Sequence, residues 1–217
     1  MTENYCDKNN TECAKKEQLA KDAPILGKWL WLLFWLIVPS SIVSLISADS
    51  IGELYPKLYF IGQILSAGCS ALYGFILLQL VKQEPMYKTA GILVLITSAV
   101  SAVLALISGF GEIHKWTLLI SLPAAVAAFA GEYYEFMAHS FVVNDVDREL
   151  AMKWERLWKW YIRCYIAIIA AIAVTIIIPA AAIIILFGAA IGIAVVSIMK
   201  LVYVYRTAKL FREYSDV

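Results

Sequence analysis

Three ionisable residues stand close together in the second half of the chain. Glu132, Glu135 and His139 are three and four positions apart, with Tyr133 and Tyr134 between the two acids. Offsets of three and four place side chains on one face of an α-helix. Carboxylates and an imidazole can hold a proton, a cation or a metal, and histidine titrates near neutral pH. This spacing therefore predicts a candidate ion or proton site.

The segments that must position these groups are strongly apolar. The chain has 217 residues, of which 62% are hydrophobic and 16% charged, whereas soluble domains are roughly 45–50% apolar and about 25% charged. Its formal net charge of +1 provides no field that would attract nucleic acid, so we exclude that partner. The composition predicts a multi-pass protein of the plasma membrane, with the lipid bilayer as its first partner.

The apolar residues fall into stretches of membrane-spanning length. A bilayer core about 30 Å thick needs about 20 apolar residues per helix. Residues 164–199 form one uncharged run, which would be about 54 Å long as a single helix and too long for one crossing. Pro179 is the expected turn between two crossings, because proline breaks a helix interior. We predict an all-α bundle with six transmembrane spans, at about 29–47, 58–81, 89–110, 116–143, 161–178 and 181–200.

Basic residues predict the orientation of this bundle. With six spans, all of the 18 basic residues except Lys57 and Lys115 fall on one side. Cytoplasmic segments carry the excess of Lys and Arg, so both termini are expected in the cytoplasm. The predicted organisation is a poorly ordered cytoplasmic arm (1–24), a transmembrane domain (25–205) and a cytoplasmic tail (206–217).

The fourth span is the one that carries the ionisable cluster. Its uncharged part, residues 117–131, is too short to cross alone, so the span is expected to continue through Glu132, Glu135 and His139. Within a membrane, such groups cost several kcal/mol each unless they are paired or hydrated, and they are functional candidates for that reason.

A second interpretation places the same cluster at the headgroups. The glutamates would then face Arg148, Lys153 or Arg163 of the following helix. The HExxH pattern of zinc proteases is absent, and the other histidine, His114, is expected on the outer side. We therefore predict no metal site and no cofactor.

Residues 145–160 have the pattern of an amphipathic helix. Val146, Leu150, Trp154, Leu157 and Trp158 recur at intervals of three and four, and charged residues occupy the opposite face. We expect this helix to lie on the membrane surface before the fifth span, where tryptophan is favoured. The alternative is a docking surface for a cytoplasmic partner.

Small residues recur at four-residue intervals within three spans, and helices in lipid associate through such residues. These candidate packing positions are Gly62, Ser66, Ser70 and Gly74 in the second span, Thr97, Ser101, Ala105 and Gly109 in the third, and Gly188 and Gly192 in the sixth. We expect the second and third spans to pack together, and the sixth to pack within the bundle or against another copy of the chain.

A resemblance is carried by the C-terminal third. His139-Ser140 and the runs at 150–154 and 157–162 resemble stretches in uncharacterised small multi-pass membrane proteins of Gram-positive bacteria. The resemblance implies a bacterial membrane protein without an assigned activity. Members often begin with a cysteine-rich zinc ribbon, whereas the arm here has only Cys6 and Cys13 and could not hold that metal.

No catalytic signature stands out, so no catalytic residue is assigned. The expected role is non-enzymatic, as an accessory or scaffold component of a membrane complex, with another membrane protein or a second copy as partner. The alternative is a small transporter or channel for a proton, a cation or a small solute that uses Glu132, Glu135 and His139.

Overall fold

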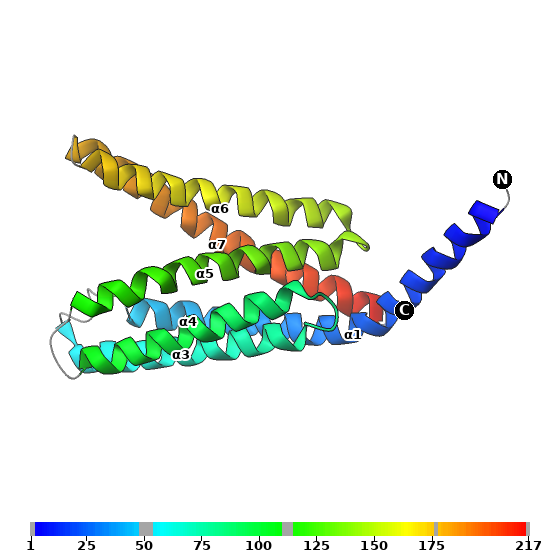
Figure 1. Cartoon of the computed structure of the whole chain (residues 1–217), viewed down its shortest axis with the longest axis horizontal. Helices are drawn as coiled ribbons and strands as arrows, with labels where there is room; N and C mark the ends of the chain where they lie inside the picture. The colour runs from blue at the N-terminus through cyan, green and yellow to red at the C-terminus, as the bar shows by residue number, and fades with distance from the viewer. Residues whose placement is uncertain (1–2, 48–53, 110–114, 176–177, 216–217) are drawn as a thin grey trace.

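The fold is all-helical. The computed structural model describes the backbone of residues 3–47, 54–109, 115–175 and 178–215, and the side chains of 21–44, 46–47, 54–107, 119–175 and 178–214. These residues form the helices α1 (Glu3–Ile46), α3 (Pro56–Gln79), α4 (Met86–Gly109), α5 (Lys115–Asn144), α6 (Arg148–Thr175) and α7 (Pro179–Ser215) (Figure 1). The predicted helical class is confirmed, and no strand occurs within the described ranges.

The helices are arranged as a ring. Each helix packs against its neighbours in the sequence, and α7 packs against α1, which brings the last helix back to the first. Both termini lie at the same end of the molecule (Figure 1). Toward the other end, the hairpin of α6 and α7 diverges from the remaining helices (Figure 1). The ring therefore has a closed end near the termini and a wider end opposite.

Five of the helices are long and apolar enough to cross a membrane, judged over the described residues. These candidate spans are Lys21–Ser44, Pro56–Gln79, Met86–Ile107, Arg148–Thr175 and Pro179–Tyr214. They identify a membrane protein. The remaining long helix, α5, contains Glu132 and Glu135 and is not among the five, so six crossings and their orientation stay predictions.

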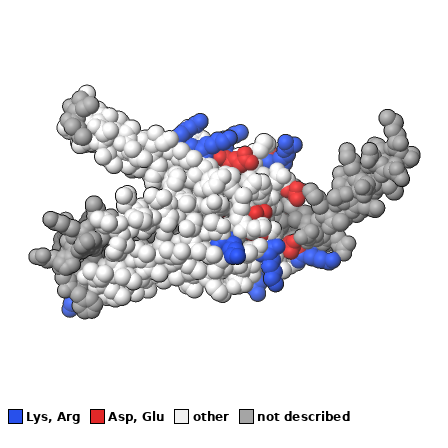
Figure 2. All heavy atoms as spheres, in the orientation of Figure 1, with Lys and Arg blue, Asp and Glu red and all other residues white. Residues whose placement is uncertain are grey.

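Charged side chains gather toward one end of the molecule. Figure 2 shows lysine, arginine, aspartate and glutamate concentrated over the part of the visible face nearer the termini, while the opposite part is almost entirely uncharged. A boundary of this kind is what a membrane protein shows where it leaves the hydrocarbon region.

The separate surface helix predicted at 145–160 is not present. Instead, α6 runs from Arg148 to Thr175 without interruption. The sequence between 145 and 175 contains neither glycine nor proline, so nothing in it breaks the helix. The apolar face that suggested a membrane surface is buried inside the protein, where Trp154 and Trp158 pack on Phe136 of α5.

The N-terminal arm belongs to the first helix. The structure has α1 helical from Glu3 through Ile46, with Pro24 and Pro39 both inside it. Its first part extends away from the bundle beyond the C-terminus (Figure 1). Residues 3–23 contain no glycine or proline to oppose helix formation. A further proline, Pro123, is inside α5.

The second and third apolar stretches, now α3 and α4, approach each other closely. A Cβ atom built on Gly91 would lie 2.9 Å from the carbonyl oxygen of Gly74, so only glycine allows this contact. Nearby, the Ser98 hydroxyl donates a hydrogen bond of 2.7 Å to the carbonyl of Ala67 across the same interface. Gly62 instead faces α1, where its built Cβ would lie 3.1 Å from the Ser47 nitrogen.

The other small residues named from the sequence have different surroundings. Ser70 and Thr97 line a cavity. On the same two helices, Ser66 is half-buried, Ser101 is exposed and Ala105 is buried, and the burial of Gly109 lies outside the described residues. On α7, Gly188 has no neighbouring atom within 4 Å of a built Cβ, and Gly192 faces Cys164. Of these positions, Gly74 lies between α3 and α4, whereas Ser70 and Thr97 face the cavity.

Candidate functional site

The ionisable cluster of α5 faces the interior of the helix ring. Glu135 and His139 are 1% and 0% exposed, and Glu132, one turn nearer the wide end of the ring, is one-third exposed. The structure thus brings together the three residues that the spacing singled out. His114, the other histidine, lies outside the described residues.

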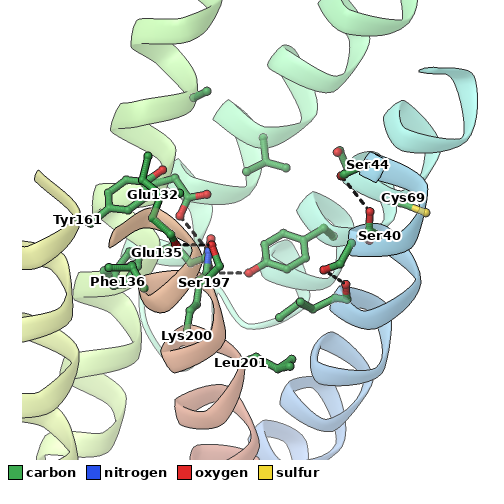
Figure 3. A pocket seen from close by; sticks show the side chains of 18 of the residues that line it. Ser40, Ser44, Cys69, Glu132, Glu135, Phe136, Tyr161, Ser197, Lys200 and Leu201 are labelled. Carbon is green, nitrogen blue, oxygen red and sulfur yellow. Dashed lines mark hydrogen bonds and ion pairs between the residues drawn. The ribbon is translucent and has the colours of Figure 1, made fainter. Parts of the chain in front are cut away.

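Lys200 of α7 is the cation that pairs with both acids of this cluster. Its Nζ atom lies 2.9 Å from Oε2 of Glu132 and 2.9 Å from Oε1 of Glu135. Figure 3 shows the lysine reaching from α7 to both carboxylates of α5. Buried charges require partners of this kind, because an isolated ion in a low-dielectric interior is costly. The cluster therefore ties α5 to α7.

The basic residues that the second interpretation predicted as partners of the glutamates were wrong. Arg148, Lys153 and Arg163 form no ion pair with Glu132 or Glu135 in the described part of the chain. Those residues lie on α6, whose buried face is filled by apolar and aromatic side chains. The sequence did hold one signal for Lys200, since apolar residues follow it directly in Leu201–Tyr205 and indicate that the buried helix continues past the charge.

Two aromatic residues complete the surroundings of Glu135 and Lys200. The Tyr73 hydroxyl of α3 donates a hydrogen bond to Oε1 of Glu135. Lys200 Nζ lies 5.2 Å from the ring centroid of Phe136 and 5.6 Å from that of Tyr73. A cation within about 6 Å of a ring face is attracted by the ring. Three helices therefore hold Glu135 and Lys200 in place.

His139 occupies the innermost position of the cluster. Its Nδ1 shares a hydrogen bond of 2.8 Å with the Tyr87 hydroxyl of α4, and its ring stacks on Trp154 with centroids 4.6 Å apart. The other ring nitrogen, Nε2, is buried without a hydrogen-bond partner and lies 3.6 Å from Oε1 of Glu135. The imidazole is thus oriented with one nitrogen toward the carboxylate, at a distance that a small approach would turn into a hydrogen bond.

The charges of the cluster do not cancel. Two carboxylates face one ammonium group, which leaves one negative charge when His139 is neutral and none when it is protonated. Within the described residues, no group of three His, Cys, Asp or Glu side chains is arranged to hold a metal ion. The cluster can therefore attract one further positive charge, as a proton or a cation.

A cavity of about 510 Å³ reaches the cluster from the middle of the ring. Its wall includes Glu132, Glu135 and Lys200 on one side and residues of α1 on the other, and all six helices contribute to it. In Figure 3, Ser40 and Ser44 of α1 lie across this space from Glu132. Glu132 is the more exposed of the two acids, so an ion or solute that enters the cavity would contact Glu132 first.

Hydroxyl groups supply the cavity wall with hydrogen-bond acceptors. Ser40, Ser41, Ser44, Thr97 and Ser197 each donate their hydrogen to a backbone carbonyl of their own helix. A hydroxyl whose proton is used in this way can act only as an acceptor, through its oxygen lone pairs, toward an ion or solute in the cavity. Together with the surplus carboxylate, these acceptors favour a cation, a proton or a proton-donating solute over an anion.

No protein family matches the chain, and neither a curated protein nor a solved structure is significantly similar to it. The resemblance to membrane proteins of Gram-positive bacteria accordingly stays a prediction. What the protein does must be inferred from the cluster and its cavity.

Proposed function

We propose that this protein is a small membrane transporter or channel that takes up a proton or a small cation at Glu132, inside the helix ring. One observation carries the proposal: a buried cluster with one surplus carboxylate borders a cavity whose hydroxyl groups act as acceptors. Ionisable groups inside membrane bundles mark ion pathways and proton relays. The accessory or scaffold role stays a prediction, and it gives no reason for a charged cavity.

In this proposal the two acids have different tasks. Glu132, at the cavity wall, exchanges the positive charge, while Glu135 keeps Lys200 in place through its own ion pair. Arrival of a cation or proton at Glu132 weakens that acid's bond to Lys200, and the ammonium group then rests on Glu135 alone. His139, next to Glu135, supplies a further proton-binding group on the closed side of the cluster.

The orientation of transport follows from the distribution of charge. We infer that the charged end near the termini is cytoplasmic, because Lys and Arg concentrate in cytoplasmic segments. The cavity lies on the other side of the cluster, lined by Ser41 and Ser44 of α1. In this orientation, the proton or cation enters the cavity from the outer side. Its release to the cytoplasm requires the closed end to open.

The test is ion flux in reconstituted vesicles. The purified protein is placed in vesicles that contain a dye sensitive to protons, sodium or potassium in turn, and the imposed gradient of the matching ion is followed with each dye. We expect at least one gradient to dissipate faster than in protein-free vesicles, and Glu132→Gln to return the rate to that of protein-free vesicles.

The matched control is Glu149→Gln. Glu149 is an exposed acid of α6 that pairs with Lys153 and does not line the cavity, so this variant should keep the wild-type rate. Equal flux in protein and protein-free vesicles for all three ions, or an undiminished rate in Glu132→Gln, would contradict the proposal. Recovery of a stable partner from mild detergent would then favour the scaffold role.

A further inference from the structure

A second cavity lies between α6 and α7, apart from the ionisable cluster. It is a groove of about 670 Å³, and every residue that lines it belongs to these two helices. The helices are consecutive and antiparallel, so the first turns of α6 lie beside the last third of α7. The groove therefore runs along the hairpin, from the end near the termini toward the apolar end.

The two ends of this groove differ in polarity. Lys153, Arg156 and Arg163 of α6 line its first part. Further along, the lining residues are apolar or small, as with Ile185 and Gly188 of α7. A basic mouth that continues into an apolar slot matches the two parts of an anionic lipid, a phosphate headgroup and an acyl chain.

The arginines at the mouth are available to an anion. Neither Arg156 nor Arg163 has an acidic partner within the described part of the chain. Arg163 lies with its guanidinium carbon 5.2 Å from the ring centroid of Trp160, which is half exposed beside it. Guanidinium groups bind phosphate oxygens through paired hydrogen bonds, and tryptophan is favoured at headgroup depth.

The slot is open at a glycine of α7. A Cβ atom built on Gly188 would have no neighbour within 4 Å, so this position is open space. Gly192, one turn closer to the mouth, lies directly against Cys164 of α6. Gly188 is therefore the open part of the slot, whereas at Gly192 the Cys164 side chain occupies the space that a larger residue would need.

We propose that this groove binds an anionic phospholipid, with its phosphate between Arg156 and Arg163 and an acyl chain along the open slot at Gly188. A second copy of the chain fits the groove less well. Two-fold contact would bring the same basic residues of both copies together, and like charges repel across an interface. This inference does not depend on the proposed transport activity.

The experiment measures lipid retention by the full-length protein. Native mass spectrometry in a neutral detergent follows titrations with phosphatidylglycerol and, separately, with phosphatidylcholine. We expect the wild type to retain phosphatidylglycerol preferentially. The double variant Arg156→Gln, Arg163→Gln should weaken its apparent affinity for phosphatidylglycerol about tenfold, as expected for losing charge-assisted hydrogen bonds to the phosphate.

Two further variants separate the groove from general surface charge. Lys159→Gln removes an exposed cation of α6 that does not line the groove, and it should bind as the wild type does. Gly188→Leu fills the slot while leaving every charge in place, and its Cβ has no neighbouring atom within 4 Å, so it should also lose phosphatidylglycerol.

Several outcomes would overturn the inference. They are equal retention of the two lipids by the wild type, an equal loss in Lys159→Gln, or unchanged binding in Gly188→Leu. A dimer in the wild type that Gly188→Leu converts to a monomer would assign the groove to a second copy instead.

Discussion

The two ends of the helix ring are built from the same helices but packed differently. Near the termini, Leu30 and Leu33 of α1 are fully buried, and so are Ala208 and Phe211 of α7. Farther along α1, the serines at 40, 41 and 44 line the open cavity, and on α7 so does Ser197. A helix that presents large apolar side chains in one half and small hydroxyl residues in the other can close one end of a bundle and leave the other open.

The ionisable cluster lies at the boundary between these ends. His139 is enclosed on the closed side with Trp154 and Tyr87, whereas Glu132 and Glu135 border the cavity. Its position at this boundary means that one set of side chains belongs both to the packed core and to the wall of the cavity. Variants that weaken the cluster, the closed end or the open end test this difference between the two ends.

The largest effect is expected from removing the shared cation. Lys200→Met leaves Glu135 buried without its partner, and breaking a buried pair in this way costs about 3–5 kcal/mol of unfolding free energy. Thermal unfolding followed by circular dichroism, in one detergent, should show a large decrease in midpoint.

Two variants control that measurement. Lys209→Met breaks an exposed pair with Glu213 on the same helix and should change stability by about 1 kcal/mol or less. Adding Glu135→Gln to Lys200→Met should restore part of the loss. If Lys200→Met is as stable as Lys209→Met, the cluster does not hold α5 to α7.

A smaller effect should separate the two ends by packing alone. Trp154 is fully buried in the closed end, so Trp154→Ala should cost about 3 kcal/mol by leaving a cavity. Phe187, near the start of α7 at the open end, is 69% exposed. Phe187→Ala should cost about 1 kcal/mol or less, and equal losses in the two variants would remove the distinction between the ends.

The smallest effect concerns the interface of α3 and α4, which passes through both ends. Gly91→Ala places a methyl group 2.9 Å from the Gly74 carbonyl and should destabilise by about 1–3 kcal/mol. Gly68→Ala, on α3 with no neighbour within 4 Å, should be neutral or stabilise by up to about 1 kcal/mol through helix propensity. A stable Gly91→Ala variant would mean that the close approach is not needed.

Local patterns predicted the parts of the site that lie on one helix. Glu132, Glu135 and His139 share a face because their spacing matches the helical repeat, and the structure has them on the same face of α5. The same reasoning failed at α6, where the apolar face of 145–160 was assigned to the membrane surface. Periodicity indicates that a face is buried, and it does not indicate whether lipid headgroups or another helix cover it.

The amino-acid sequence by itself determined that this is an all-helical membrane protein with an ionisable cluster on one helix face, because composition and helical periodicity are local properties. Only the tertiary structure decided the partners of that cluster. Tyr73 and Lys200 are 62 and 68 positions from the acids they bind. Their meeting depends on which helices are neighbours in the ring and at what height their side chains face one another. That registry comes from the packing of whole helices, and no short stretch of residues specifies it.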